Sequence, residues 1–253
     1  MKQGIRAFFK QPLAMIGLFF MFMAGMSIAT MLPFIGSMIA LVLLPGATLG
    51  LMAASKETML GKFPMPAILV SAFRAGTQRL QAMLVLGVLY AVGFLLIMGI
   101  TTLVDGGQFA RLYLLGGKIT EELLTSSDFL SAMWVALALY LPLSMLFWHA
   151  PGLVHWYGVS PVKSLFFSAV ACLRNFGAYT VYSLVWMGVF LAVGVAVTLI
   201  AAITGSPSML SVVLLPVAML IVAMFFTSIY FTFSDSFVDT DATATAVGTP
   251  ASP

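Results

Sequence analysis

Charged residues are scarce in this chain of 253 residues. Asp, Glu, Lys and Arg together make up 8% of the sequence, whereas 62% of the residues are hydrophobic. An average soluble domain has about 25% charged residues, and a soluble protein needs them to keep its surface hydrated. The composition therefore excludes a soluble enzyme, a nucleic-acid-binding module and a disordered protein. It indicates an integral membrane protein.

The residues that build metal and catalytic sites are also few. The sequence has one cysteine, Cys172, and two histidines, His149 and His155. A single thiol forms no internal disulfide. Six residues of separation place the two histidines on different faces of a helix, so we expect them at the membrane interface among aromatic residues. No HExxH, P-loop or nucleophile-elbow motif occurs. We expect no catalytic residue, no metal, no cofactor and no enzymatic activity.

Four long stretches, 11–55, 80–104, 129–162 and 175–234, contain no charged residue. About 20 apolar residues cross the hydrocarbon core as a helix, and turn-forming residues near Pro33 and at 204–208 divide the first and last stretches. The sequence thus predicts an all-α polytopic membrane protein. It would have six transmembrane helices in one membrane domain, 1–238, with spans near 13–32, 37–54, 81–103, 130–150, 177–203 and 209–232. Residues 239–253 are rich in Ala, Thr and Pro, which predicts a disordered cytoplasmic tail.

Basic residues gather in alternate loops. Nine lie before the first span or after the second and fourth: Lys2, Arg6, Lys10, Lys56, Lys62, Arg74, Arg79, Lys163 and Arg174. Two, Arg111 and Lys118, follow the third span together with four acidic residues. Short loops rich in Lys and Arg stay in the cytoplasm. We therefore expect a multi-pass protein of a bacterial inner membrane with both termini cytoplasmic.

The three hairpins of this topology share a pattern. A proline follows a leucine in each even-numbered span, at Pro45, Pro142 and Pro216. Proline inside a helix removes a hydrogen bond and kinks the helix. Three such prolines at matching places predict a threefold repeat. Each copy would have an entry segment, a first helix and a proline-kinked second helix.

The entries to the second and third hairpins, 66–80 and 161–175, are amphipathic on a helical projection. We expect interfacial helices there, with four basic residues contacting lipid headgroups: Arg74, Arg79, Lys163 and Arg174. The partners would be membrane lipids, anionic ones included. The alternative is that each segment is only a cytoplasmic extension of its span.

Two sets of small residues recur at intervals of four. One is Gly46 with Gly50, and the other is Gly188 with Ala192 and Ala196. Small residues at this spacing allow helices to approach closely. We expect packing within one bundle, and dimerisation is the alternative.

Several runs resemble a known family. They are 147–154 (FWHAPGLV), 160–161 (SP), 168–175 (SAVACLRN), 10–12 (KQP), 43–45 (LLP) and 230–237. Over residues 8–237 the chain resembles the BPSS-type uncharacterised inner-membrane proteins of proteobacteria. More distantly it is similar to the membrane region of some glycerophosphodiester phosphodiesterases. The resemblance implies a six-helix bacterial inner-membrane protein. It transfers no catalytic residue, because the family has no established activity and the phosphodiesterase domain is missing.

The spans contain no charged residue away from their ends, whereas proton- and ion-coupled transporters keep such residues inside the membrane. We therefore expect a non-enzymatic envelope or lipid-associated scaffold, or a membrane partner of another protein. The alternative is a passive transporter or channel for a small or amphipathic molecule, with its path between the kinked helices. Polar cavities at the prolines would favour the alternative, and close packing there would favour the scaffold.

Overall fold

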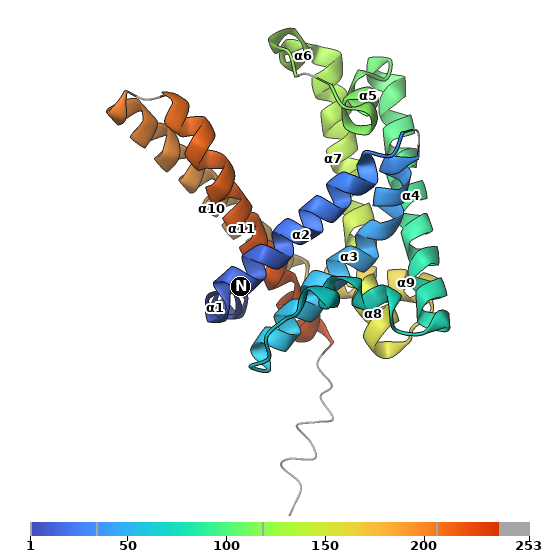
Figure 1. Cartoon of the computed structure of the whole chain (residues 1–253). Coiled ribbons are helices and arrows are strands. Elements are labelled where there is room, and N and C mark those ends of the chain that lie inside the picture. The colour runs from blue at the N-terminus through green and yellow to red at the C-terminus, as the bar shows by residue number, and fades with distance from the viewer. Residues whose placement is uncertain (1, 34, 118, 206, 238–253) are drawn as a thin grey trace, which may run out of the picture.

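The computed structural model describes residues 2–33, 35–117, 119–205 and 207–237, with side chains left out at 207–211 (Figure 1). These residues form helices and no strand. The predicted tail 239–253 lies outside the described residues. The elements are α1 (Lys2–Lys10), α2 (Pro12–Thr30), α3 (Gly36–Met59), η1 (Pro66–Phe73), α4 (Thr77–Asp105), α5 (Gln108–Leu115), α6 (Glu121–Thr125), α7 (Ser127–Phe147), α8 (Ala150–Tyr157), α9 (Pro161–Arg174), α10 (Phe176–Thr204) and α11 (Pro207–Ser236).

Six helices of the described chain are long and apolar enough to cross a membrane: α2, α3, α4, α7, α10 and α11. This agrees with the predicted all-α class and six spans. The fourth apolar stretch continues through α8, so that Ser127–Tyr157 reads as one candidate span. The six helices form three hairpins, α2–α3, α4–α7 and α10–α11, in chain order.

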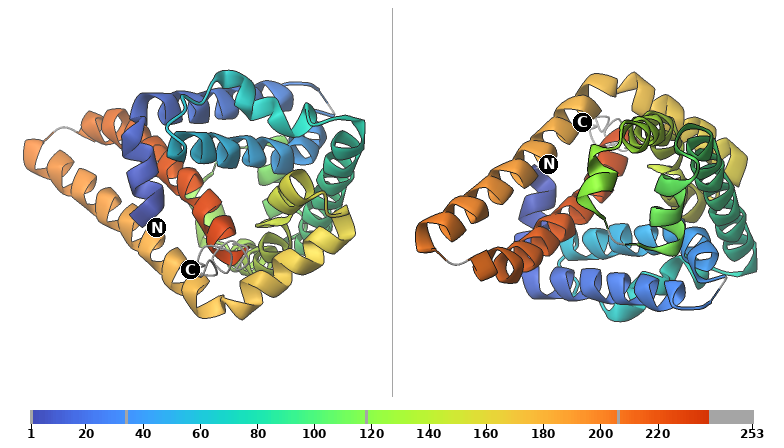
Figure 2. Two further views of the ribbon diagram at one scale, coloured as in Figure 1. Left: turned by 90° about the horizontal axis from the view of Figure 1, so that it is seen from below. Right: turned by 90° about the horizontal axis from the view of Figure 1, so that it is seen from above.

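Helix α3 is the centre of the bundle. It packs against α2, α4, η1 and α11, and half of its most apolar stretch is buried, against 17% for α10. Helix α10 packs chiefly on α11, with a smaller contact to α9. The α10–α11 hairpin leans away from α4 and α7 (Figure 1). Seen along the bundle, α10 lies at the edge and α11 lies between it and the rest (Figure 2).

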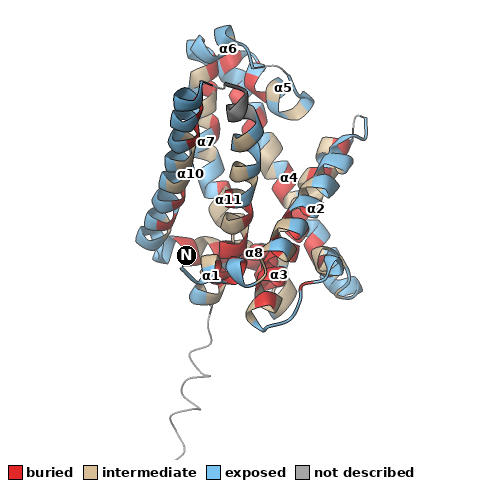
Figure 3. Cartoon of the chain, turned by 60° about the vertical axis from the view of Figure 1, so that its left-hand side comes forward, coloured by how far each residue is buried: buried red, intermediate tan, exposed pale blue. Residues whose placement is uncertain are grey.

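The bundle has two distinct ends. The end that carries α1, η1, α8 and α9 is at the bottom of Figure 1, and α5 and α6 lie at the other end. We call the first the basic end, because the nine Lys and Arg residues of the alternate loops lie on or beside these elements and the C-terminal end of α3. Buried residues gather there, where α1, α3 and α8 meet, while much of α10 is exposed (Figure 3).

The three prolines each lie inside a helix, Pro45 in α3, Pro142 in α7 and Pro216 in α11. Pro45 is buried, whereas Pro142 and Pro216 are exposed. Pro45 and Pro216 are both preceded by Leu-Leu. Pro45 and Pro216 therefore lie in different environments, although both follow Leu-Leu in the sequence.

The first hairpin has its own entry helix, which the sequence reading missed. Helix α1 buries Gly4, Ala7 and Phe8 on one face, at helical spacing, and exposes Lys2, Arg6 and Lys10. A Cβ on Gly4 would lie 2.6 Å from Cα of Ser228, so α1 and α11 are in direct backbone contact. Because α1, η1 and α9 each precede a hairpin, each of the three hairpins has an entry helix.

The entry to the second hairpin is not the continuous helix that the sequence predicted. Element η1 is a 3₁₀ helix that ends at Phe73, and Gly76 has a φ of 93° before α4 begins at Thr77. A left-handed residue of this kind interrupts a right-handed helix. Ser71, Arg74 and Gln78, which would share one polar stripe on a continuous helix over 66–80, therefore do not share one helical face.

The two sets of small residues have different surroundings. Gly46 and Gly50 pack against η1, and a Cβ on Gly50 would lie 2.6 Å from the Cα and carbonyl oxygen of Leu69. The stripe of Gly188, Ala192 and Ala196 is exposed on α10. Close packing within the chain therefore holds for the first set alone.

Candidate functional site

The four predicted headgroup residues, Arg74, Arg79, Lys163 and Arg174, all lie exposed at the basic end. The side chains of three of them, Arg74, Lys163 and Arg174, have no hydrogen bond or ion pair to another described residue. Arg79 differs, because its Nη1 donates a hydrogen bond of 2.5 Å to the carbonyl oxygen of His155. That carbonyl is in the last turn of α8, where helices leave acceptors free. Arg79 therefore ties α4 to α8 in addition to any role towards lipid.

Helix α9 shows an arrangement that its sequence only partly predicts. Ser164, Ser168, Ala171 and Cys172 face the bundle and are buried. The exposed surface combines Lys163 and Arg174 with large apolar side chains: Val162, Phe166, Phe167 and Leu173. Exposed apolar and basic side chains on one helix are typical of a helix that lies in the membrane interface.

His149 is buried among aromatic side chains, those of Tyr179, Phe233 and Phe237. Its side chain is 0% exposed, between α7 and α8. Nε2 lies 2.5 Å from the hydroxyl oxygen of Tyr179 on α10, and the backbone N–H donates to Oγ of Ser168 at 3.0 Å. His149 thus joins three elements that are distant in sequence.

A row of small hydroxyl residues on α11 completes this polar contact. Ser228, Thr232 and Ser236 recur every four residues and so share one face of the helix. Ser228 Oγ lies 2.5 Å from the hydroxyl oxygen of Tyr182. Ser236 Oγ lies 3.3 Å from the hydroxyl oxygen of Tyr179, and Thr232 accepts a hydrogen bond of 2.9 Å from Nε1 of Trp148. The four-residue spacing of these hydroxyl residues can be read from the sequence, whereas their hydrogen-bond partners cannot.

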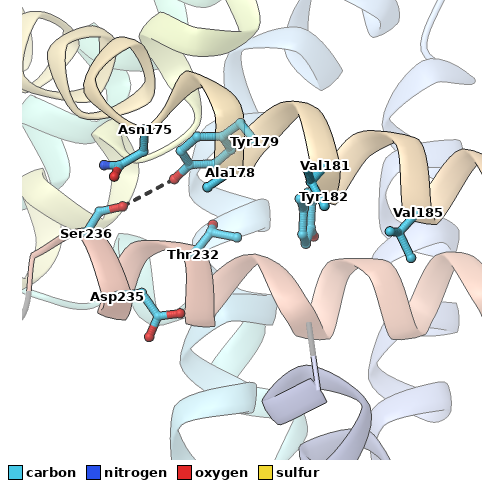
Figure 4. A pocket seen from close by; sticks show the side chains of 9 residues that line it. All are labelled: Asn175, Ala178, Tyr179, Val181, Tyr182, Val185, Thr232, Asp235 and Ser236. Carbon is cyan, nitrogen blue, oxygen red and sulfur yellow. Dashed lines mark hydrogen bonds between the residues drawn. The ribbon is translucent and has the colours of Figure 1, made fainter.

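A cavity of about 300 Å³ opens between α10 and α11 beside these hydrogen bonds (Figure 4). Its polar part lies at the basic end, and its apolar part follows α10 towards the middle of the helix. The lining residues are Asn175, Ala178, Tyr179, Val181, Tyr182, Val185, Thr232, Asp235 and Ser236. Small-molecule sites combine apolar walls with a few polar groups in this way.

A second cavity of about 570 Å³ adjoins the first, because both are lined by Asn175, Asp235 and Ser236. Arg174 and Phe167 of α9 add to its wall. Arg174 and Asp235 are the two charged residues of this combined cavity. Neither has an ion pair to another described residue.

Among the described residues, no group of three His, Cys, Asp or Glu side chains is close enough to hold a metal ion. Cys172 is buried in α9, and its Sγ lies 3.7 Å from the carbonyl oxygen of Met145. Burial disfavours the thiolate and raises the pKa of Cys172 to about 11. A thiol with so high a pKa is a poor nucleophile at neutral pH.

The fold defines a polytopic α-helical membrane protein. A protein from Burkholderia thailandensis named as a probable inner membrane protein is 38% identical to this chain over 218 residues. The aligned part covers 85% of this chain and 81% of the relative. The chain belongs to the same family of inner-membrane proteins as this relative, as the sequence resemblance predicted. No family model matches the chain, and no solved structure matches it.

Proposed function

We propose that this protein is a non-enzymatic, lipid-associated scaffold of the inner membrane whose basic end binds anionic phospholipid headgroups. One observation carries the proposal. The entry segments α1, η1 and α9 lie at the same end of the bundle and place exposed Lys and Arg beside exposed apolar side chains. This combination suits the boundary between headgroups and acyl chains.

Electrostatic attraction between the exposed basic residues and anionic headgroups contributes to lipid binding at the basic end. Each Lys or Arg near an anionic leaflet contributes about 1 kcal/mol. The side chains of Arg74, Lys163 and Arg174 have no hydrogen bond or ion pair to a described residue and are therefore available to headgroups. The orientation is part of the proposal: the basic end and both termini face the cytoplasm, in line with the distribution of Lys and Arg over the loops.

The alternative function, a passive path between proline-containing helices, has less support. Pro142 and Pro216 are exposed rather than lining a closed path, and Pro45 is buried. A cavity of about 440 Å³ between α4, α5 and α7 is lined by apolar and aromatic residues, among them Leu137 and Tyr140. Such a lining offers few partners to a polar solute.

The test is lipid retention by the full chain purified in mild detergent and measured by mass spectrometry. A triple variant, Arg74→Gln, Lys163→Gln and Arg174→Gln, should lose most of its co-purified phosphatidylglycerol and cardiolipin. Arg111→Gln at the other end is the matched control and should retain both lipids. Arg79→Gln is measured separately, because it also breaks the contact with His155. Unchanged anionic lipid in a folded triple variant would overturn the proposal.

A further inference from the structure

The combined cavity between α9, α10 and α11 contains one cation and one anion. Arg174 lies on α9 and Asp235 lies on α11, and both line the cavity. Both side chains are exposed, and neither is engaged by a described residue of opposite charge. A site for a purely anionic headgroup would not place a carboxylate in its wall, because like charges repel.

The cavity also has an apolar continuation. It follows α10 from Asn175 to Val185, which corresponds to about 15 Å at the rise of an α-helix. Half of the hydrocarbon core of a bilayer is also about 15 Å thick. The apolar part of the wall, which includes Val181 and Val185, can therefore follow one acyl chain through one leaflet.

We propose that this cavity binds one zwitterionic phospholipid whose headgroup carries a phosphate and a primary ammonium, as in phosphatidylethanolamine. Arg174 binds the phosphate. The second N–H of Asn175 Nδ2 is a further donor, since the first donates to the carbonyl oxygen of Ala171. Asp235 binds the ammonium, with the hydroxyl of Ser236 as a further acceptor. One acyl chain lies along Val181, Tyr182 and Val185 between α10 and α11. The inference rests on the proposed lipid association and names the lipid class at one place on the basic end.

The chemistry distinguishes this headgroup from others. Guanidinium groups pair with phosphate through several N–H donors, and a carboxylate accepts strong hydrogen bonds from an ammonium. Phosphatidylglycerol lacks the ammonium. Phosphatidylcholine has a cation without N–H donors, so it can satisfy Arg174 but offers Asp235 no hydrogen bond.

The experiment uses the full chain in detergent with defined amounts of phosphatidylethanolamine, phosphatidylcholine and phosphatidylglycerol, and counts bound lipids by native mass spectrometry. The wild type should retain the ethanolamine lipid in preference to the choline lipid. Asp235→Asn should reduce retention of the ethanolamine lipid by about tenfold, the usual effect of losing one hydrogen bond to a charged group. Glu122→Gln at the other end of the bundle is the matched control and should change nothing.

A second variant tests the position of the acyl chain. Val185→Trp fills the apolar part of the cavity without changing Arg174 or Asp235, and it should also reduce retention of the ethanolamine lipid. Soluble phosphoethanolamine should not displace the lipid, because it lacks the chain. Displacement by phosphoethanolamine at equal concentration would overturn the acyl-chain placement.

The outcomes separate this inference from the proposed function. If Asp235→Asn leaves the preference for ethanolamine unchanged in a folded protein, the zwitterion site is wrong, even if the triple basic variant loses anionic lipid. If Asp235→Asn abolishes the preference while the triple variant keeps its anionic lipids, the zwitterion site stands and the anionic scaffold is wrong.

Discussion

Nε2 of His149 lies 2.5 Å from the hydroxyl oxygen of Tyr179, although the two residues are 30 positions apart in the sequence. The same hydroxyl lies 3.3 Å from Oγ of Ser236. Helix α10 packs on few other elements, so this contact is one of the links between the third hairpin and the rest of the bundle.

We predict that Tyr179→Phe destabilises the protein by about 1–3 kcal/mol, because the change leaves a buried imidazole nitrogen without its partner. Unfolding in a detergent titration would measure the change. Tyr182→Phe should act in the same direction, because it removes the hydrogen bond to Ser228. Tyr113→Phe, at an exposed position of α5, is the control. Equal stability of the Tyr179 variant and this control would contradict the prediction.

The backbone contact between α3 and η1 gives a steric prediction. An added Cβ on Gly50 would come within 2.6 Å of Leu69, and overpacking of this kind costs about 1–3 kcal/mol. We expect Gly50→Ala to lower the melting temperature in detergent. Gly17→Ala is the matched control, since nothing lies within 4 Å of its added Cβ and alanine favours the helix. A stable Gly50 variant would show that η1 can move away from α3 at little cost.

The proposed topology is tested with reporter fusions. Fusions after Ser55, after Val162 and at the C-terminus should report the cytoplasm, and a fusion near Gly116 should report the periplasm. The reason is the excess of Lys and Arg in the alternate loops. A C-terminal fusion active in the periplasm would contradict the predicted pairing of the spans.

Cys172 should resist alkylation at neutral pH. Its side chain is 3% exposed, and burial raises its pKa to about 11. A raised pKa keeps the thiol protonated, so labelling by a maleimide should stay low at pH 7.5 and increase only as the pH approaches 11 or the protein unfolds. Adding an exposed thiol with Gln78→Cys gives the control, which should label fully at pH 7.5. Rapid labelling of Cys172 in the native protein at that pH would contradict the buried position of this face of α9.

The position of the helices could be predicted better than their contacts. Each span is a local property, because about 20 apolar residues favour the membrane whatever their neighbours are. The interruption of the helix at Gly76, by contrast, could not be predicted from the sequence. A helical projection of 66–80 assumes one period throughout, and it could not show the 3₁₀ geometry of η1 or the positive φ that ends it.

In the candidate site, too, some features could be predicted from the sequence and others could not. The four exposed basic residues were predicted from the sequence, because charges avoid the membrane core and so mark its edges. The cavity between α10 and α11 was not predicted, because its residues Tyr179, Tyr182 and Thr232 lie in apolar spans and nothing in the sequence sets them apart. Whether a hydroxyl in a span faces lipid or a partner depends on which helix packs beside it.

The sequence by itself determined that this is an integral membrane protein, that it has six membrane-spanning helices and that its basic residues lie in alternate loops. These properties follow from the transfer free energy of each segment, which is a sum over local residues. The tertiary structure alone decided that His149 meets Tyr179, that Gly50 lies against Leu69 and that Arg174 shares a cavity with Asp235. Those contacts depend on how each helix is rotated about its own axis, and packing between helices sets that rotation.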